Sequence, residues 1–442
     1  MKKTIVLITV LFAALFFARV SLAATYYVAT TGNDANPGTI SQPFRTIQKA
    51  ADVVHAGDTI LVRSGTYQDN VQMQYSGTSG NPITLKNYPG EHPVLDFGLS
   101  DENGPVRRLT LVAAEGYVHP IGWIVIEGLE VTRGYDGIKF YNAHDVIIRR
   151  NYIHNNAVQG ILGNGIRVTI DGNIVSRNGL PILQQNPGDN KNHGMYLSGT
   201  DFTITNNLVY SNAAYGIQVA GYPYDPARHA SSEYAGAQNF LISNNIIAFN
   251  WNRAGIVIWL PDAINTAIQN NVLYENSVNY LEGIQGINFN QAGGGNIVRN
   301  NLFYSSSGKT AIYDSAGGSS YTQTNSINAD PLFANAQGLD FHLKPGSPAI
   351  DKGFSAGAPS TDYAGVSRPQ GVAYDIGAYE YVSGATLTGD VNQDSKVDVL
   401  DVQACVNHIL AVQDYGSSAD VNKDGSVNVL DVQTVVNIIL GV

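Results

Sequence analysis

The sequence is poor in cysteine, in charge and in long apolar runs. Its single cysteine, Cys405, cannot form a disulfide within the chain, so stability must come from packing and bound ions. Charged residues make up only 14% of the chain, and 36 acidic against 25 basic residues leave a net charge of −11. This balance argues against a nucleic-acid-binding protein, which needs a basic surface. After residue 17, no apolar run approaches the roughly 20 residues that a membrane-spanning helix requires.

The one long apolar run lies at the N-terminus. Lys2 and Lys3 precede the run from Ile5 to Phe17, and Ser21-Leu22-Ala23 supplies the small residues that a signal peptidase reads. This pattern predicts a secretory signal peptide over residues 1–23. We therefore expect the mature chain to be soluble outside the cytoplasm, either secreted or held at a cell surface.

Near the C-terminus one phrase occurs twice, GDVNQDSKVDVLDVQACVNHIL from Gly389 and ADVNKDGSVNVLDVQTVVNIIL from Ala419. In each copy, oxygen-bearing side chains occupy positions 1, 3, 5, 9 and 12 of a twelve-residue loop, and position 7 offers its carbonyl. This spacing is typical of a loop that wraps around Ca²⁺. The predicted ligands are Asp390, Asn392, Asp394, Lys396, Asp398 and Asp401 in the first copy, and Asp420, Asn422, Asp424, Ser426, Asn428 and Asp431 in the second.

Each loop is followed by one apolar helix, expected over residues 402–410 and 432–440, and position 12 holds Asp instead of Glu. Over residues 389–440 these features resemble a type I dockerin, a small all-α module. The resemblance implies two bound Ca²⁺ ions and a cohesin-bearing partner. Because both copies present the same face, it also implies two docking orientations; alternatively, Val399 and Val429 pack between the helices. By position in the family, the cohesin-facing residues are Val399, Leu400 and Asn407, and Val429, Leu430 and Asn437.

Between the two ends, a short phrase recurs from about residue 130 to 305. It consists of an apolar strand, an Asn that is often doubled, a second apolar strand and another Asn. The intervals between successive phrases are 22, 34, 38, 26 and 30 residues, which is typical of a solenoid. Because one strand residue in two is expected to point inward, we predict a right-handed parallel β-helix with three short strands per turn. The Asn residues expected to stack at its bends are Asn151, Asn173, Asn207, Asn245, Asn271 and Asn301.

Both ends of this solenoid carry further signals. An amphipathic helix expected from about Thr46 to Val54 fits a lid over the N-terminal end. The segment around it, YYVATTGNDANPGTISQPFRTIQKA, and the segment from Asp330 to Tyr381 resemble the entry and terminal segments of secreted β-helix proteins of the pectate-lyase-like superfamily. The expected organisation is a signal peptide (1–23), a β-helix with its cap (24–318), a closing segment (319–383), a linker (384–388) and the dockerin (389–442).

A candidate site follows from the strand pattern. Six strands begin with Gly and an apolar residue expected to point inward, so the next residue points outward. Two long excursions, Gly179–Asn192 and Tyr222–Gln238, should wall the resulting surface from opposite sides, as a trough for an extended sugar chain. The outward columns read Lys139, Leu162, Tyr196, Gln218, Val257 and Asn288, and Tyr141, Asn164, Ser198, Ala220, Trp259 and Asn290.

Two chemistries suit this trough. β-Elimination of a uronate needs a base and a cation that neutralises the carboxylate. His193 and Tyr196 are the candidate base and acid, and Lys139 is a third catalytic candidate. A hydrolase would need two carboxylates about 5–9.5 Å apart, for which Asp262 and Glu233 are available. Alternatively, His193 caps a bend and Tyr196 stacks on sugar. The expected substrate-binding residues are Lys191, Gln218, Arg228, Trp259, Asn288 and Asn290.

The sequence therefore predicts a mainly β, secreted polysaccharide-active enzyme tethered to a cohesin, with a lyase favoured over a glycoside hydrolase. The full residue pattern of a single lyase family is not visible. A non-catalytic carbohydrate-binding or surface-scaffold β-helix is accordingly the alternative. Whether a third Ca²⁺ binds in the trough is left open.

Overall fold

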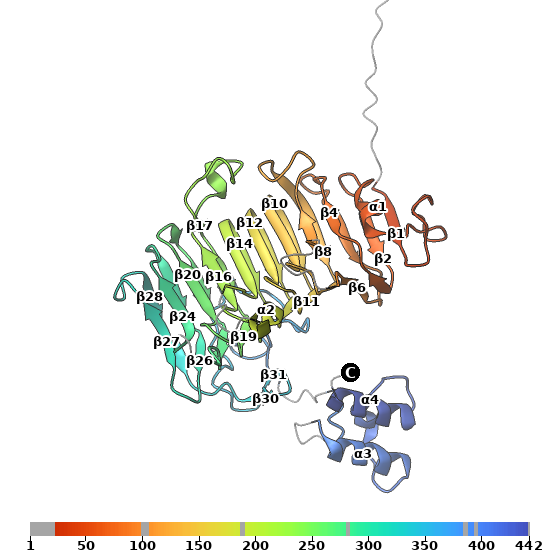
Figure 1. Ribbon diagram of the computed structural model, residues 1–442. Coiled ribbons are helices and arrows are strands. Elements are labelled where there is room, and N and C mark those ends of the chain that lie inside the picture. Colours follow the sequence, from red (N-terminus) through yellow and green to blue (C-terminus); the bar gives the residue numbers. More distant parts are fainter. Residues whose placement is uncertain are drawn as a thin grey trace, which may run out of the picture.

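The computed structural model describes residues 23–98, 106–185, 191–279, 283–382, 388–392 and 397–440. The predicted signal peptide lies outside these residues except for its last position. Among the residues described, no helix combines the length and the apolar character needed to cross a membrane. Figure 1 shows successive strands stacked into a solenoid, and a pair of C-terminal helices.

The solenoid is a parallel β-helix, as predicted. Two faces of each turn form one 19-stranded sheet that bends around a corner, and the third face is a separate 10-stranded sheet. The corner is clearest in β10 (Ile138–Arg149), whose first part pairs with β7 (Leu109–Leu111) and whose second part pairs with β8 (Ile121–Glu127). Apart from the separate hairpin described below, the strand ladders are parallel, so the core is a stack of inward side chains from successive turns.

The remaining strands of the larger sheet are β1 (Thr25–Val28), β2 (Thr59–Val62), β4 (Val71–Met73), β5 (Ile83–Asn87), β12 (Ile161–Asp171), β14 (Met195–Thr205), β16 (Ile217–Ala220), β17 (Ala237–Gln238), β18 (Leu241–Ser243), β20 (Ile256–Trp259), β21 (Ala263–Ile264), β22 (Ala267–Gln269), β24 (Ile284–Asn290), β25 (Asn296–Arg299), β27 (Thr310–Asp314) and β28 (Tyr321–Thr324). The smaller sheet contains β3 (Gly65–Tyr67), β6 (Pro93–Asp96), β9 (Glu130–Thr132), β11 (Tyr152–His154), β13 (Ile174–Ser176), β15 (Leu208–Tyr210), β19 (Ile246–Ala248), β23 (Val272–Tyr274), β26 (Leu302–Tyr304) and β29 (Ile327–Asn328).

Two ladders of buried Asn run along the solenoid. In the first, the Nδ2 group of each predicted Asn from Asn151 to Asn271 donates to Oδ1 of the Asn one turn further on, at 2.9–3.0 Å, and Asn301 ends the series. The second ladder joins Asn156, Asn178, Asn212, Asn250 and Asn276 at 2.7–3.1 Å. Because the amides also bond to backbone groups at each bend, the Asn columns satisfy buried polar groups and are structural, as predicted.

The first Asn of each doubled pair has a different role. Asn206, Asn244, Asn270 and Asn300 have φ between +50° and +56°, a left-handed conformation that Asn adopts more readily than most residues. Their side chains bond to the C-terminal segment; Asn300 Nδ2, for example, donates to the Lys352 carbonyl at 2.8 Å. The doubled Asn thus serves the interior with one residue and the C-terminal segment with the other.

The C-terminal segment was expected to close the end of the β-helix, but it runs back along the side of the solenoid. It begins with the antiparallel hairpin of β30 (Phe333–Asn335) and β31 (Asp340–Leu343). Phe341 and Ile376 then pack against outward residues of the smaller sheet such as Ile246. The physical reason is that this sheet presents an apolar outer face over several turns, which the segment covers.

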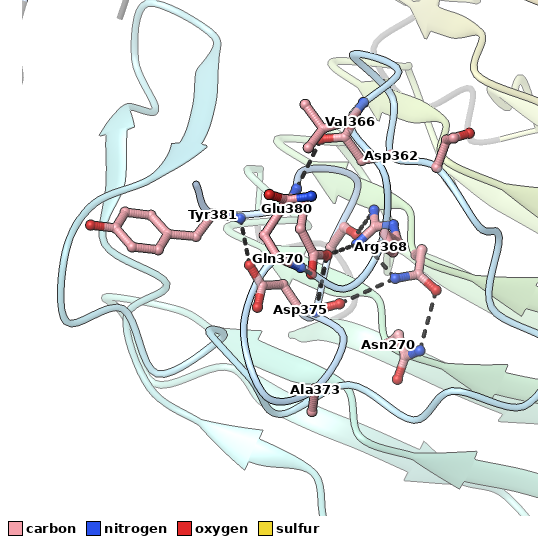
Figure 2. Close-up of polar contacts among 12 residues, drawn as sticks. Asn270, Asp362, Val366, Arg368, Gln370, Ala373, Asp375, Glu380 and Tyr381 are labelled. Atoms are coloured by element: carbon pink, nitrogen blue, oxygen red, sulfur yellow. Dashed lines mark hydrogen bonds and ion pairs between the residues drawn. The ribbon is translucent and has the colours of Figure 1, made fainter. Parts of the chain in front are cut away.

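A buried polar cluster holds this segment in shape (Figure 2). Arg368 and Glu380 have fully buried side chains and form an ion pair at 2.6 Å. Glu380 also accepts backbone N–H bonds from Gln370 and Asp375, and Arg368 donates to the Gly377 carbonyl. Burial raises the pKa of Asp375 to about 6. Because each charge has several hydrogen bonds, the cluster compensates for its lost hydration.

The helices are short. The N-terminal helix α1 (Ile47–Ala51) is capped by Thr46, whose side chain accepts the Lys49 N–H, and it buries Ile47, Ala50 and Ala51 against the first strands. In the dockerin, α3 (Val399–Ile409) and α4 (Val429–Leu440) begin three residues before the predicted starts. The remaining helical segments are α2 (Leu180–Gln185) and the 3₁₀ turns η1 (Ser232–Tyr234) and η2 (Gly416–Ala419).

The early start of α3 has a local cause. Asp398, at loop position 9, accepts the Leu400 N–H, and Asp401 accepts the Asp398 N–H, which together make a capping box. Asn428 and Asp431 make the equivalent bonds before α4. The residues expected to bind metal at loop positions 9 and 12 therefore also cap the helices. The spacing of metal ligands in the sequence does not by itself predict this second role.

Candidate functional site

The register of the strands confirms the predicted outward column. Lys139 pairs with Leu162, which pairs with Tyr196, and the column continues through Gln218, Val257 and Asn288. It ends at Tyr313 in β27. The residues before this column, from Ile138 to Ile287, have no exposed surface, so alternate side chains point inward and outward as expected.

The floor of the trough is not open along its whole length. Gln218 and Asn288 are only 5% and 2% exposed, so these two predicted substrate-binding residues do not present a free surface. Neighbouring Val257 is buried with Tyr215, and Trp259 packs against them. The open part of the floor consists of half-buried Lys139, Leu162, Tyr196, Tyr141, Ser198, Trp259 and Asn290, with exposed Tyr313 at the end.

The wall of the trough is the long loop between β16 and β17, which turns back over earlier turns (Figure 1). Asn142, at the corner of β10, is buried and has φ +48°. Its Nδ2 group donates to the carbonyls of Tyr117 and Arg228, at 2.6 and 2.8 Å, and its Oδ1 accepts the Ala230 N–H. Asn142 therefore joins two loops that are more than 100 residues apart in sequence, counted from Tyr117 to Ala230.

Aromatic side chains line this wall and the adjoining floor. The hydroxyl groups of Tyr196 and Tyr222 form a hydrogen bond, and the Tyr222 ring meets Trp259 edge to face at 5.9 Å. Burial and this hydrogen bond raise the pKa of Tyr196 well above its usual range, so its phenol remains protonated. We call Tyr196, Tyr222 and Trp259 the aromatic shelf. Such a shelf offers apolar faces to a sugar ring while keeping hydroxyl groups for hydrogen bonds.

A cationic group lies at the other end of the trough. The Lys139 Nζ atom is 5.2 Å from the centre of the Tyr141 ring and 5.7 Å from that of Tyr117. Close by, Arg108 forms an ion pair with buried Asp136. Burial lowers the pKa of Lys139 and the charge of Arg108 lowers it further, whereas Asp136 acts in the opposite direction. A lysine in this setting releases its proton more readily than an exposed one, as a general base requires.

His193 bonds to the backbone beside a bend, which was the alternative to its expected role as a base. Its N–H donates to Gln159 Oε1 at 2.6 Å, and its Nδ1 accepts the Tyr215 N–H at 3.2 Å. Gln159, His193 and Tyr215 each precede the Gly that leads into a strand. The two hydrogen bonds therefore link three successive turns of the solenoid. Burial, with a smaller contribution from Arg253, lowers the pKa of His193 to about 3. A neutral ring whose Nδ1 accepts a hydrogen bond carries its proton on Nε2, so it has no free lone pair to act as a base.

The other predicted residues lie around the rim. Arg228 has a 71% exposed side chain, paired with Asp225 at 3.3 Å, and its backbone is held by Asn142. Lys191 is exposed, and its carbonyl accepts a hydrogen bond from Gln159 Nε2 at 3.0 Å. Glu233 and Asp262, the candidate hydrolase carboxylates, are both exposed.

Sequence reasoning missed Tyr117, Tyr141, Tyr222 and Asn142 as parts of the site. Tyr141 had a usable signal, since it stands in the second outward column. Tyr117 and Tyr222 lie on loops, where no period indicates which way a side chain points.

The second calcium loop can be followed completely. Its Asp420 accepts the N–H groups of Asp424 and Gly425, and Asp431, fully buried, accepts those of Val421 and Asn422. Among the described residues, no group of three or more His, Cys, Asp or Glu side chains is arranged to hold a metal. The fit to Ca²⁺ therefore rests on the mixture of carboxylate, amide and carbonyl oxygens that this hard cation prefers.

The first loop is described in part. Asp394 and Lys396 lie outside the described residues. Asp401 nevertheless accepts the Val391 and Asn392 N–H groups at 2.8 and 3.1 Å, the same distances as for Asp431 in the second loop. The two copies therefore share the geometry of position 12.

The predicted partner-binding residues are on the surface. Val399 and Val429 are both 71% exposed, and Leu400 and Leu430 are both 56% exposed. The alternative that the two valines pack between the helices is therefore wrong. Two helical turns on, Asn407 accepts a bond from Gln403, and Asn437 accepts the same bond from Gln433.

Comparison with known proteins agrees with this architecture. Residues 26–178 match the Pel9A-like right-handed β-helix region, and residues 388–440 match the type I dockerin domain. The uncharacterized protein YwoF of Bacillus subtilis (strain 168) is 27% identical over 443 residues, covering 73% of this chain and 91% of that protein. Pectate lyase PEL9 of Emericella nidulans is 46% identical over 87 residues, which cover 19% of this chain and 21% of PEL9.

Among solved structures, the crystal structure of pectate lyase Pel9A has the same fold. It aligns with a TM-score of 0.58 at 19% identity, covering 82% of this chain and 97% of that one. Residue spacing, strand register and family matches lead to one assignment: the chain joins a Pel9A-like right-handed parallel β-helix region to a C-terminal type I dockerin.

Proposed function

We propose that this protein is an extracellular polysaccharide lyase that cleaves a uronate-containing chain by β-elimination and is held to a cohesin-bearing protein by its dockerin. The observation that carries the proposal is Lys139, a half-buried lysine with a lowered pKa at the cationic end of the trough. The similarity to proteins named pectate lyases supports the reaction class.

In this reaction, the lone pair of Lys139 Nζ removes the proton from the ring carbon beside the uronate carboxylate. The electrons of that C–H bond form a C=C bond while the bond to the oxygen of the next sugar breaks. Arg228, exposed on the facing loop, binds the carboxylate as negative charge develops. A phenol donates its proton to the departing oxygen, which gives one unsaturated end and one new hydroxyl end.

The proposal moves two roles away from the residues first expected to hold them. Lys139 replaces His193 as the base, because the His193 ring already accepts a backbone hydrogen bond. Tyr141 replaces Tyr196 as the acid, because its ring lies beside Lys139 Nζ whereas Tyr196 stands two turns away. Tyr196 then serves as a sugar-stacking surface.

The test is to incubate the mature protein with uronate polysaccharides and to follow ultraviolet absorbance of the unsaturated product together with reducing ends. Lys139→Met should lower the elimination rate by about 10²–10⁴, the usual contribution of a general base. Tyr141→Phe should have a large effect and Tyr196→Phe a small one. Lys86→Met, at a half-buried lysine on a strand outside the trough, is the matched control. Full activity in Lys139→Met would refute the assignment.

A non-catalytic carbohydrate-binding protein is the second candidate. The aromatic shelf favours it, because stacking surfaces bind sugar without any chemistry. Reducing ends without absorbance would indicate a hydrolase that uses Glu233 and Asp262. Binding without either product would favour this second candidate.

The dockerin completes the proposal. The twelve predicted ligands would hold two Ca²⁺ ions, one in each loop, and the bound ions would neutralise the carboxylates that each loop brings together. Val399, Leu400 and Asn407, or Val429, Leu430 and Asn437, then contact the cohesin. Because the two faces have equal exposure, either can dock. The chain is thereby attached outside the cell to a cohesin-bearing protein.

A further inference from the structure

A buried ion pair lies beside the strand that carries Lys139. Arg108 immediately precedes β7, and Asp136 lies two residues before Ile138, where β10 begins. The Arg108 guanidinium forms an ion pair with the Asp136 carboxylate, and their side chains are only 14% and 1% exposed. Water and salt therefore screen these two charges little. Such charges act on a neighbouring titratable group more strongly than surface charges do.

The pairing of β7 with β10 brings both charges close to Lys139. The Leu109 N–H donates to the Gly137 carbonyl, so Arg108 stands beside the start of β10, about one strand spacing, or 4.8 Å, away. Asp136 is three residues before Lys139 in the same segment of chain. The ion pair is thus fixed by the backbone at the end of the trough where the proposed base lies.

One oxygen of the Asp136 carboxylate has no partner. Oδ2 contacts Arg108, whereas Oδ1 is buried and accepts no hydrogen bond from any residue that the structure describes. Leaving a buried carboxylate oxygen unsatisfied is costly. The ammonium that forms when Lys139 takes the substrate proton would place a positive charge near this oxygen. The carboxylate therefore favours the protonated form of Lys139.

The two charges act on Lys139 in opposite directions. Burial lowers the pKa of Lys139 and repulsion by Arg108 lowers it further, whereas attraction by Asp136 raises it. A general base works best when its pKa lies near the pH of the reaction, so a balance of this kind suits the role. The other titratable groups around Lys139 are Tyr117 and Tyr141, whose rings face its Nζ atom, and the exposed Arg228–Asp225 pair of the loop between β16 and β17.

We propose that Arg108 and Asp136 are positioning residues of the elimination reaction, which together keep Lys139 an effective base. Arg108 favours the free amine that removes the substrate proton, and Asp136 stabilises the ammonium that results. This role rests on the proposed function for what Lys139 does. The control of its protonation by the pair can nevertheless be measured without any substrate.

Removing one charge at a time tests this role. NMR of protein made with ¹³C-labelled lysine follows the protonation of Lys139, whose signal is the one missing from Lys139→Met. Asp136→Asn keeps the shape of the side chain and an acceptor for Arg108, so Lys139 should lose its proton at a pH about one unit lower than in the wild type. Arg108→Met should move this transition about one unit higher. The acid limb of the kcat/KM profile, which reports the base in the free enzyme, should move with it.

Two further variants separate this role from a structural one. Arg108→Lys keeps the positive charge and should leave the titration of Lys139 close to that of the wild type. The double variant Arg108→Met/Asp136→Asn removes both charges and should titrate between the two single variants. A purely structural role would lower activity in these variants without moving the titration in opposite directions. Thermal unfolding identifies any variant that does not fold, and Asp136→Asn decides the matter if Arg108→Met is one of them.

The outcomes are distinguishable. An unchanged titration of Lys139 in folded Asp136→Asn, or movement in the same direction in both single variants, would overturn the role of the pair. The proposed function would still stand if Lys139→Met lacked elimination activity. Opposite movements of the titration, in a wild-type protein that gives no elimination product from uronate polysaccharides, would support control of Lys139 by the pair and refute the lyase.

Discussion

The β-helix and the dockerin are both built from sequence repeats. In the β-helix only interior residues recur, whereas in the dockerin exposed residues recur as well. In the β-helix the repeated residues are interior ones, such as Asn207 and Asn245, while the outward residues change from turn to turn. In the dockerin the repeat includes buried Asp401 and Asp431 and also exposed Val399 and Val429. An interior repeat maintains a fold, whereas a repeated exposed face presents the same surface twice to a partner.

This difference has a physical basis. An Asn in the ladder bonds to its equivalents one turn before and one turn after, so every turn must supply the same group at the same height. No such coupling acts on outward side chains, which are free to vary and to form a site. In the dockerin the outward residues are coupled only through a partner.

Calcium removal should give the largest effect and should affect only the dockerin. Chelation with EDTA leaves the carboxylates around each loop without their cation, so cohesin binding should fall about a thousandfold or more. The β-helix should keep its unfolding temperature, since its ladders involve no metal. Circular dichroism and cohesin binding before and after added Ca²⁺ would check this. A drop in β-helix stability would indicate a further ion there.

Replacing an interior Asn should have the next largest effect. Asn245→Leu removes bonds to Asn207, Asn271 and Ile204, and leaving these groups unsatisfied should cost about 4 kcal/mol of unfolding free energy. The side chain of neighbouring Asn244 donates to the Asp375 and Gly377 carbonyls of the C-terminal segment and accepts bonds from Ser243 and Asn270, but it takes no part in the interior ladder. Asn244→Gly, which keeps the left-handed backbone accessible, should cost about 1 kcal/mol. Denaturant unfolding would compare them, and equal costs would contradict the division of roles.

On the repeated dockerin face, each single substitution should have little effect on cohesin binding, whereas the two substitutions together should have a large one. Val399→Asp or Val429→Asp alone should weaken cohesin binding only about twofold, because the other face remains available. The double variant should lose about a hundredfold or more, equivalent to about 2.7 kcal/mol. Surface plasmon resonance would measure all three. A large loss in one single variant would show that only one face is used.

His193 provides the smallest but most specific test. His193→Gln should be nearly neutral in stability, because Gln159 already accepts a backbone N–H in the same way one turn earlier. His193→Leu leaves the Tyr215 N–H unsatisfied and should cost about 2 kcal/mol. Elimination activity should survive in His193→Gln. If it were lost while the fold remained intact, His193 would be the base after all.

The same residue makes stability depend on pH. Burial lowers the pKa of His193 to about 3, so between that value and its ordinary 6.5 the unfolded chain binds more protons than the folded one. Stability should therefore fall as pH decreases from 6.5 toward 3. The His193→Gln variant should lose less stability over this range, as measured by thermal unfolding at several pH values.

A site residue could be predicted from the sequence only where it lies on a strand, because the two-residue alternation of a strand shows which side chains point outward. Lys139, Tyr196 and Trp259 were placed on the outer face by strand alternation alone, and the register agrees. Asn142 and Tyr222 were not foreseen, because their roles depend on where a long loop returns. The role of His193 depended on which N–H group the next turn brings beside its ring.

By itself, the sequence determined the β-helix, the Asn ladder and the two dockerin loops that are predicted to bind calcium. Each of these features depends on the spacing of residues within one turn or one loop. In the β-helix, stacking of the turns then repeats the same arrangement along the solenoid. Only the tertiary structure decided which outward residues stay open, since Gln218 and Asn288 share their column with Lys139 yet are covered by neighbours. It also decided that the C-terminal segment covers the side of the solenoid. Burial depends on contacts between residues far apart in the chain, and no local spacing specifies those contacts.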